Sequence, residues 1–363
     1  MRGHSLRSWN RSIIAVRTAI VKPAHISGLG LGLCLILALA TPPSGMHRAN
    51  ATRIGMPEST NQSVASRNEI WAKSVQADKL GNLDLTQIVA ALGDSHRLVG
   101  YLADMGYRLD SLRDGVGTVP RLYLASLPND LPQVESAEIR KTVFIKSILP
   151  AILRTNEEII DRRARLEALS RKLELGRELS GSEQAWLAET AALYDLKTPN
   201  LPELLRRVDV VPPSLALAQG ALESGWGTSR FAQNGNALFG QKIFIESHEA
   251  MPSYDRNGKE VFRMRSFDDV QGSVRSYVHN LNSHPAYANF RKLRAEMRKK
   301  TAPGRNDFGP QAADALAKTL LRYSERGADY IADVRQLMQV NDLRAFDRAQ
   351  LASDQIGGTR RGV

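Results

Sequence analysis

The stretch that decides the fold reads VPPSLALAQGALESGWGTSRF and covers residues 211–231. It opens with a Pro-Pro pair, continues through small and apolar residues, and then reaches Glu223-Ser-Gly. Proline is favoured in the first turn of a helix, and glycine directly after the last turn. The pattern therefore predicts a helix over residues 214–224 that carries a carboxylate in its last turn.

Glu223 has the surroundings of a proton donor. It lies at the negative end of the predicted helix dipole and among apolar neighbours, and both effects raise the pKa of a carboxyl group. Cleavage of a glycosidic bond needs such a protonated acid, because the leaving oxygen must accept a proton. Taken alone, Glu223 fits a solvated glutamate at a helix end better, so the decision depends on its neighbours.

The residues that follow favour a sugar-binding site. Glycines on both sides of Trp226 allow the backbone to turn sharply beside the carboxylate. The indole offers a flat apolar face on which a sugar ring can stack, although packing in the core is its alternative role. A loop with amide donors and an aromatic ring follows at residues 235–241. The candidate substrate-binding residues are Ser224, Trp226, Asn236, Phe239 and Gln241.

The rest of the chain predicts a mostly helical α+β protein. Downstream, the apolar runs 243–245 and 261–264 are separated by an Asp-Arg-Asn-Gly turn, which predicts a β-hairpin. Apolar stripes at helical spacing begin at residue 138. A Ser-x-Ser-Glu start signal predicts another helix over 180–193. Further helices are predicted at 268–281, 286–300, 310–322 and 328–341.

Length and composition agree with a globular protein. The chain has 363 residues, 42% hydrophobic and 24% charged, enough for about two domains. The predicted parts are a signal peptide or membrane anchor (1–40), a linker with a poorly assigned segment (41–117), a helical N-terminal region (118–202), a catalytic domain (203–347) and a flexible tail (348–363).

The N-terminal segment has the pattern of an export signal. Several arginines precede an apolar stretch over 26–40, which ends in Ala38-Leu39-Ala40. A basic region, a short apolar run and a small-x-small site are typical of a signal peptide, and an uncleaved anchor is the alternative. Cys34 is the single cysteine, so the remaining sequence offers no disulfide. We expect an exported protein, either periplasmic or anchored in the inner membrane and facing the periplasm.

Charge and motifs exclude several classes. A net charge of +11 suits an acidic polymer or an anionic membrane, and the sequence contains no nucleic-acid-binding motif. His279 and His284 are five residues apart and face different sides of a predicted helix, which argues against a metal pair. We expect no metal and no cofactor.

A basic run ends the predicted helix 286–300. Such a run is usually a solvated helix face. The alternative is a site for the carboxylates of peptide stems. Its cations are Arg291, Lys292, Arg294, Arg298, Lys299 and Lys300.

The motifs resemble a known family. LESGWGTS at 222–229 and GNALFG at 235–240 resemble the glucosaminidase family of lysozyme-like peptidoglycan hydrolases, with the proteobacterial Bax proteins as the most similar group. YVHNLNSHPAY at 277–287 and YSERG at 323–327 extend the likeness. Upstream motifs between 119 and 158 resemble the same group, so the resemblance covers about residues 118–347.

The resemblance implies a fold and a reaction. It implies a lysozyme-like α+β domain that cleaves the β-1,4 bond after N-acetylglucosamine in peptidoglycan, with Glu223 as general acid and Tyr287 at the site. It also implies a second carboxylate on the hairpin, for which Glu246, Glu249 and Glu260 are candidates and Glu249 is favoured. A lytic transglycosylase and a non-catalytic wall-binding or scaffold protein remain as alternatives.

Overall fold

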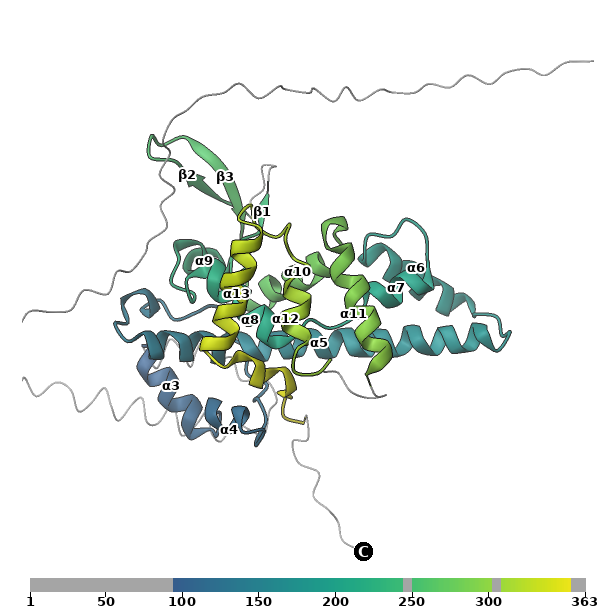
Figure 1. Ribbon diagram of the computed structural model, residues 1–363, viewed down its shortest axis with the longest axis horizontal. Coiled ribbons are helices and arrows are strands. Elements are labelled where there is room, and N and C mark those ends of the chain that lie inside the picture. The colour runs from purple at the N-terminus through teal and green to yellow at the C-terminus, as the bar shows by residue number, and fades with distance from the viewer. Residues whose placement is uncertain (1–93, 244–249, 302–307, 354–363) are drawn as a thin grey trace, which may run out of the picture. The chain divides into compact units, whose positions relative to one another are not determined.

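Helix α8, Pro213–Ser224, is the buried centre of the structure. The computed structural model describes residues 94–243, 250–301 and 308–353. Every residue of α8 from Pro213 to Ala221 is buried. The helix packs against α5 (Ala137–Glu174), α12 (Ala312–Ala317), α13 (Ala328–Val340) and the short turn η5 (Leu343–Arg348). A helix covered on all sides needs apolar residues all round, which explains its small and apolar sequence (Figure 1).

Helix α8 ends at Gly225 as the sequence predicted, and its start is held by a contact that the sequence did not show. At the start, the carboxylate of Asp347 accepts hydrogen bonds of 2.8 Å from the backbone N–H and from the hydroxyl of Ser214. An anion at a helix N-terminus is stabilised by the helix dipole. At the end, Gly225 has φ +59°, the left-handed conformation that closes a helix. Glu223 therefore sits on a rigid element held by a distant part of the chain.

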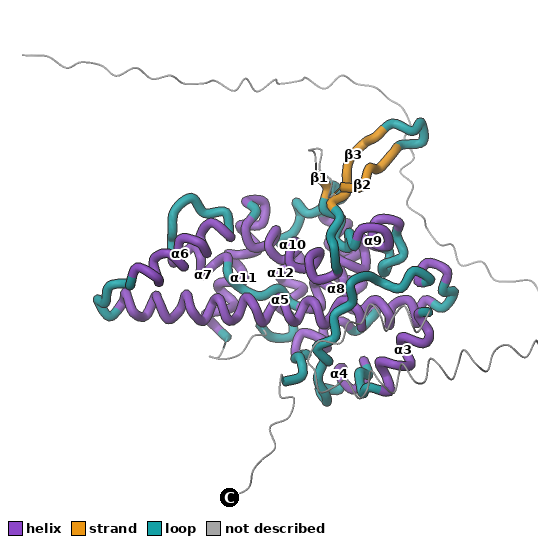
Figure 2. The backbone as a smooth tube through the Cα atoms, turned by 180° about the vertical axis from the view of Figure 1, so that it is seen from behind, coloured by secondary structure: helices purple, strands orange, loops and turns teal. Residues whose placement is uncertain are grey.

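The remaining helices surround this centre. Figure 2 shows the long α5, 38 residues, running along the helical part of the molecule, with α3 (Ser95–Asp104) and α4 (Leu109–Arg113) below it in this view. The helix start predicted at Ser180 is confirmed: α6 (Gly181–Leu193) begins with a capping box, in which the Ser180 hydroxyl accepts from the Glu183 N–H and the Glu183 carboxylate accepts from the Ser180 N–H. The other helices and helical turns are η3 (Leu131–Gln133), α7 (Leu201–Arg207), α9 (Arg230–Gly235), α10 (Val270–Ser283), η4 (Pro285–Tyr287) and α11 (Ala288–Lys300).

The sheet corrects one prediction. It has three antiparallel strands in the order β1-β3-β2: β1 is Lys242–Ile243, β2 is Ala250–Tyr254 and β3 is Glu260–Arg265. β1 does pair with β3, but β2 is the strand that the Asp-Arg-Asn-Gly turn joins to β3. The sequence hid β2 because Pro252 interrupts it and its apolar residues do not alternate. The mostly helical α+β fold itself is confirmed.

The basic run on α11 is not a fully solvated face. Arg294 is completely buried and Arg291 is 4% exposed. Helical periodicity places both on the inner side of α11, where the guanidinium groups donate to backbone carbonyls of the α7 and α10 ends. The prediction of a solvated face is therefore wrong for these two residues.

Three predicted outer parts of the chain are not reached by the structure. The predicted export signal, the linker up to residue 93 and most of the C-terminal tail lie outside the described residues. All described residues belong to one compact unit, Glu58–Val363, and the domain boundaries proposed inside it stay a prediction. Among the described helices, none has the length and apolar character needed to span a bilayer.

Candidate active site

The carboxyl group of Glu223 lies directly against the backbone of Gly240. A Cβ atom at position 240 would collide with Oε2 of Glu223 and would lie 3.0 Å from its Cδ. Gly240 also has φ +65°, a conformation that residues with a side chain rarely adopt. The glycine of the Phe-Gly-Gln loop is therefore what lets this loop close over the carboxylate.

An aromatic cluster surrounds the same carboxylate. Phe239 stacks on Tyr277 with ring centroids 4.1 Å apart, and Tyr323 stacks on Tyr330 at 5.6 Å. Tyr323 also contacts Tyr277 at 6.4 Å and Tyr287 at 6.0 Å. The rings come from the loop after α9, from α10, from η4, and from α13 and the segment before it. Glu223 thus lies beside a cluster of four tyrosines.

A chain of hydrogen bonds leads from the core to Glu223. The Tyr277 hydroxyl donates to Oε1 of Gln219 at 2.8 Å, and Nε2 of Gln219 donates to the Tyr330 hydroxyl oxygen at 3.0 Å. The Tyr330 hydroxyl is in turn hydrogen-bonded to Glu223. Because its oxygen already accepts from Gln219, Tyr330 is set to donate its proton to the carboxylate.

The electrostatic balance keeps Glu223 easier to protonate than a glutamate in water. Burial raises the pKa of its carboxyl group, and this is the largest effect. The Tyr330 hydrogen bond, together with the positive charges of Lys242 and Arg326, lowers the pKa in part. The net direction is upward, as the sequence predicted for a proton donor.

Tyr287 belongs to the same aromatic cluster and lies near Glu223, and its role at the site stays a prediction. It is 7% exposed, on the turn η4 between α10 and α11. Burial raises the pKa of its hydroxyl, and the nearby charge of Glu223 raises it further, whereas a hydrogen bond with Asn280 lowers it. Tyr287 is therefore a neutral phenol near the carboxylate of Glu223.

The candidate second carboxylates are far less defined. Glu246 and Glu249 lie outside the described residues. Glu260, on β3, is exposed and forms an ion pair with Arg263, with Nε and Oε1 2.7 Å apart. The role assigned to Glu249 stays a prediction.

Trp226 has two contacts of the kind expected for packing. Its ring meets Phe144 edge to face at 5.6 Å, and the Lys141 ammonium lies 5.4 Å from the ring centroid. Trp226 also has φ +59°, which is rare for a large side chain. Its predicted stacking against a sugar is untested.

The other predicted substrate contacts are used partly inside the protein. The Ser224 hydroxyl, fully buried, donates to the Gly220 carbonyl and accepts from the Gly227 N–H. Asn236 is 7% exposed and donates to two carbonyls before α10. Phe239 is 2% exposed and stacks on Tyr277. Their roles in substrate binding stay predictions.

Gln241 lines a hollow in the surface next to Gly240. The hollow has a volume of about 270 Å³ and is also lined by Arg265, Asn280 and His284. Gln241 follows Gly240 directly, and Asn280 is the hydrogen-bond partner of Tyr287. Oε1 of Gln241 has no hydrogen-bond partner among the described residues. The hollow therefore offers polar groups next to the proposed proton donor.

Sequence reasoning missed Gln219 and Tyr330 as site residues. Gln219 is the single polar side chain in the interior of an apolar helix, and it precedes Glu223 by four residues, which puts both on one face. That spacing was a usable signal. Tyr330 is about a hundred residues away in sequence, so only tertiary structure shows that it reaches Glu223. Within the described chain, no group of three or more potential ligands is arranged to hold a metal ion.

Comparisons with known proteins agree with these features. The family described as mannosyl-glycoprotein endo-beta-N-acetylglucosaminidase, or glucosaminidase, matches residues 198–343. Protein bax of Escherichia coli (strain K12) is 36% identical over 212 residues, which are 57% of this chain and 71% of that protein. The family match thus includes all of α8 and the segments that carry Tyr287 and Tyr330.

Two further matches are narrower. Peptidoglycan hydrolase FlgJ of Vibrio parahaemolyticus (serotype O3:K6) is 38% identical over 93 residues, 21% of this chain and 28% of that protein. Among solved structures, the catalytic domain of the autolysin Auto from Listeria monocytogenes is 16% identical, with a TM-score of 0.28; the match covers 49% of this chain and 96% of that domain.

Proposed function

Because this chain belongs to the glucosaminidase family, in its Bax-like group, we propose that it is a peptidoglycan hydrolase. In this proposal it is an endo-β-N-acetylglucosaminidase that cleaves the β-1,4 glycan strand with Glu223 as general acid. The observation that carries the proposal is the setting of Glu223, whose carboxyl group meets Gly240, hydrogen-bonds Tyr330 and has a pKa raised by burial. A carboxylic acid that stays protonated near neutral pH is the group that glycosidic cleavage requires.

The proposed first step is proton transfer. Glu223 gives its proton to the glycosidic oxygen while the bond from that oxygen to the anomeric carbon breaks, and the electron pair of the bond stays with the leaving sugar. Glu223 is then a carboxylate, which the Tyr330 hydroxyl and the charges of Lys242 and Arg326 stabilise. The chain of hydrogen bonds through Gln219 and Tyr277 keeps the Tyr330 hydroxyl pointing at it.

The sugar cation left behind needs a second group. A carboxylate nucleophile, a base-activated water or the acetamido group of the substrate each meet this need. We propose Glu249 as the hairpin carboxylate and Tyr287 as the neutral phenol beside the reacting carbon. The phenol lies near Glu223, while Glu260 is paired with Arg263.

The proposed substrate implies a location. Peptidoglycan lies outside the cytoplasmic membrane, and the sequence of residues 1–40 has the pattern of an export signal. We therefore propose an exported protein, periplasmic or anchored through residues 26–40.

Digestion of purified peptidoglycan tests the activity. The expected products are muropeptides with new N-acetylglucosamine reducing ends, whereas a lytic transglycosylase would leave anhydro sugars lighter by one water. Glu223→Gln keeps the size of the side chain and cannot donate the proton, so its rate should fall about 10²-fold or more with unchanged circular dichroism. Near-normal turnover by this variant would falsify the assignment of Glu223, and a wild-type chain that releases nothing would leave the wall-binding alternative.

A further inference from the structure

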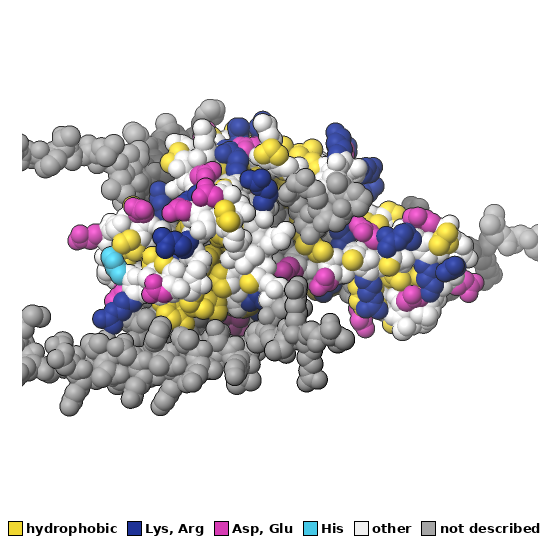
Figure 3. All heavy atoms as spheres, turned by 90° about the horizontal axis from the view of Figure 1, so that it is seen from below, with side chains coloured by type: hydrophobic (Ala, Val, Ile, Leu, Met, Phe, Trp, Pro, Cys, Tyr) yellow, Lys and Arg dark blue, Asp and Glu magenta, His cyan; other side chains and the backbone are white. Residues whose placement is uncertain are grey.

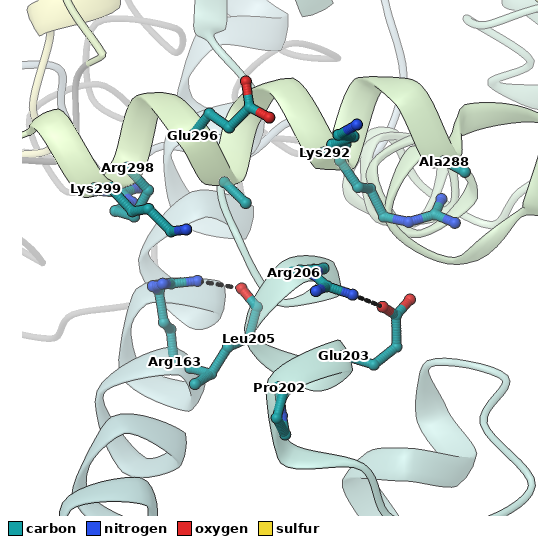
Figure 4. A pocket seen from close by; sticks show the side chains of 12 residues that line it. Arg163, Pro202, Glu203, Leu205, Arg206, Ala288, Lys292, Glu296, Arg298 and Lys299 are labelled. Carbon is teal, nitrogen blue, oxygen red and sulfur yellow. Dashed lines mark hydrogen bonds and ion pairs between the residues drawn. The ribbon is translucent and has the colours of Figure 1, made fainter.

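A basic groove lies between α7 and α11, with α5 behind it. Its volume is about 810 Å³. Six cationic side chains line it against two acidic ones, Glu203 and Glu296. The cations are Arg163, Arg206, Arg291, Lys292, Arg298 and Lys299 (Figure 4). At the end of the molecule where α5 stops, by contrast, both signs of charge intermix on the surface seen in Figure 3.

The floor of the groove concentrates positive charge. Arg163 and Arg298 share the carboxylate of Asp209, which is 1% exposed. Behind them Arg294 is completely buried, and its pKa is lowered to about 10 by burial and by the charges of Arg163, Arg291 and Arg298. Charge in a poorly solvated wall is weakly screened, so these guanidinium groups make the groove attractive to anions.

The rim leaves cations available to a ligand. Lys292 and Lys299 are exposed and have no ion pair or hydrogen bond with any other described residue. In Figure 4, the ammonium of Lys299 reaches from α11 toward α7, whereas the carboxylate of Glu296 points away from the groove. The Arg206 guanidinium donates one hydrogen bond of 3.3 Å to the carboxylate of Glu203. It keeps other donors free, since a guanidinium has five N–H groups.

The groove begins beside the proposed active site. Ala288 lines the groove and directly follows Tyr287, so their Cα atoms are about 3.8 Å apart. Arg291 donates to the carbonyls of Leu281 and His284, and thereby ties the groove wall to the turn that carries Tyr287. From Ala288 to Lys299 the wall extends roughly 16 Å along α11. A glycan strand bound at Glu223 that continues past Tyr287 would meet this row of cations.

We propose that the basic groove binds the carboxylates of the peptide stems carried by the strand being cut. Guanidinium and ammonium groups are the side chains that recognise carboxylates most strongly. The proposal rests on the proposed function, because the ligand is part of its substrate. Its consequence is that the protein prefers peptidoglycan with peptide stems to the same glycan without them.

Sedimentation with the insoluble polymer tests the groove apart from catalysis. The full chain with Glu223→Gln is bound to purified peptidoglycan, and to the same material after an amidase has removed its stems. The double variant Lys292→Ala/Lys299→Ala is compared with Arg171→Ala/Arg177→Ala, which removes two exposed positive charges outside the groove. Thermal unfolding by circular dichroism confirms that both double variants are folded.

The expected result is a loss of about tenfold or more in affinity for stem-bearing peptidoglycan in the groove variant alone, since charged hydrogen bonds of this kind each contribute about tenfold. Binding to bare glycan should be unchanged. An equal loss on both polymers, an equal loss in the arginine control, or no loss at all overturns the proposal. Failure of the wild-type chain to cut either polymer would instead refute the proposed activity, and the binding result would still stand.

Discussion

Glu223 and Glu260 show two different ways in which the fold holds a carboxylate. Glu223 ends a helix that is buried on all sides, and Gly240, Tyr330 and the aromatic cluster fix its carboxyl group. Glu260 lies on a hairpin that projects from the helices in Figure 1, and its partner is Arg263, three residues along the same strand. Catalysis depends on geometry held to a fraction of an ångström. The comparison indicates that the proposed proton donor is built into the core, while the hairpin holds Glu260 in a less constrained position.

The largest effect should come from pushing Glu223 out of place. Gly240→Ala adds a methyl group that collides with Oε2 of Glu223, and it also strains a residue at φ +65°. We expect a loss of about 10²-fold in glycan cleavage, because the carboxyl group must move away from its hydrogen bond with Tyr330. Initial rates on purified glycan strands measure this loss.

Gly176→Ala is the matched control for backbone strain. Gly176 has φ +68°, and a Cβ there would meet no atom within 4 Å. The control should lose about 1 kcal/mol of unfolding free energy and keep its activity. Equal activity losses in the two variants would mean that strain, and not the position of Glu223, explains the result.

A smaller effect should follow when one hydrogen bond to Glu223 is removed. Tyr330→Phe deletes the donor that lowers the pKa of Glu223, so this pKa should rise above its wild-type value. A general acid is active when protonated, so the alkaline limb of the pH–rate profile should move to higher pH. At the optimum pH we expect a loss of about 10-fold, because the freed carboxyl group is less well placed.

Tyr107→Phe is the matched control for the lost hydroxyl. Tyr107 is 1% exposed, and its hydroxyl has no hydrogen-bond partner among the described residues. This variant should keep both its rate and its pH profile. If Tyr330→Phe lowers the rate with no shift of the alkaline limb, Tyr330 supports the fold of the pocket and does not tune Glu223.

The same comparison explains what could be predicted from the sequence. Helix α8, its glycine end and the raised pKa of Glu223 follow from local signals: prolines, small residues and a carboxylate in the last turn. The approach of Gly240 to Glu223 joins a loop to a helix, so nothing local in the sequence shows it. The hydrogen bond between Tyr330 and Glu223 joins residues that are still further apart in the sequence, since Tyr330 lies on α13 near the C-terminal end of the fold.

The two errors have physical causes as well. β2 was overlooked because Pro252 cannot donate a ladder hydrogen bond, although the strand tolerates it at the sheet edge, where β2 is the last strand of β1-β3-β2. The sequence pattern predicts Arg291 and Arg294 on a solvated face, because arginine is seldom buried. Both side chains donate hydrogen bonds to backbone carbonyls at the ends of neighbouring helices. The amino-acid composition of a helix does not indicate such long-range bonds.

The smallest effects should come from the hairpin carboxylates. Glu260→Gln breaks an exposed ion pair with Arg263, and such a pair contributes little, so we expect a change in rate of less than about twofold. Glu246→Gln should behave similarly, whereas Glu249→Gln should lose roughly 10-fold if Glu249 orients the attacking water.

Tyr287→Phe should reduce the rate more than Glu246→Gln or Glu260→Gln, because Tyr287 is held near Glu223. The four variants are compared by initial rate on glycan strands, with circular dichroism as the folding control. Full activity of Tyr287→Phe together with an inactive Glu260→Gln would reverse the comparison, since the exposed strand would then hold the second catalytic group.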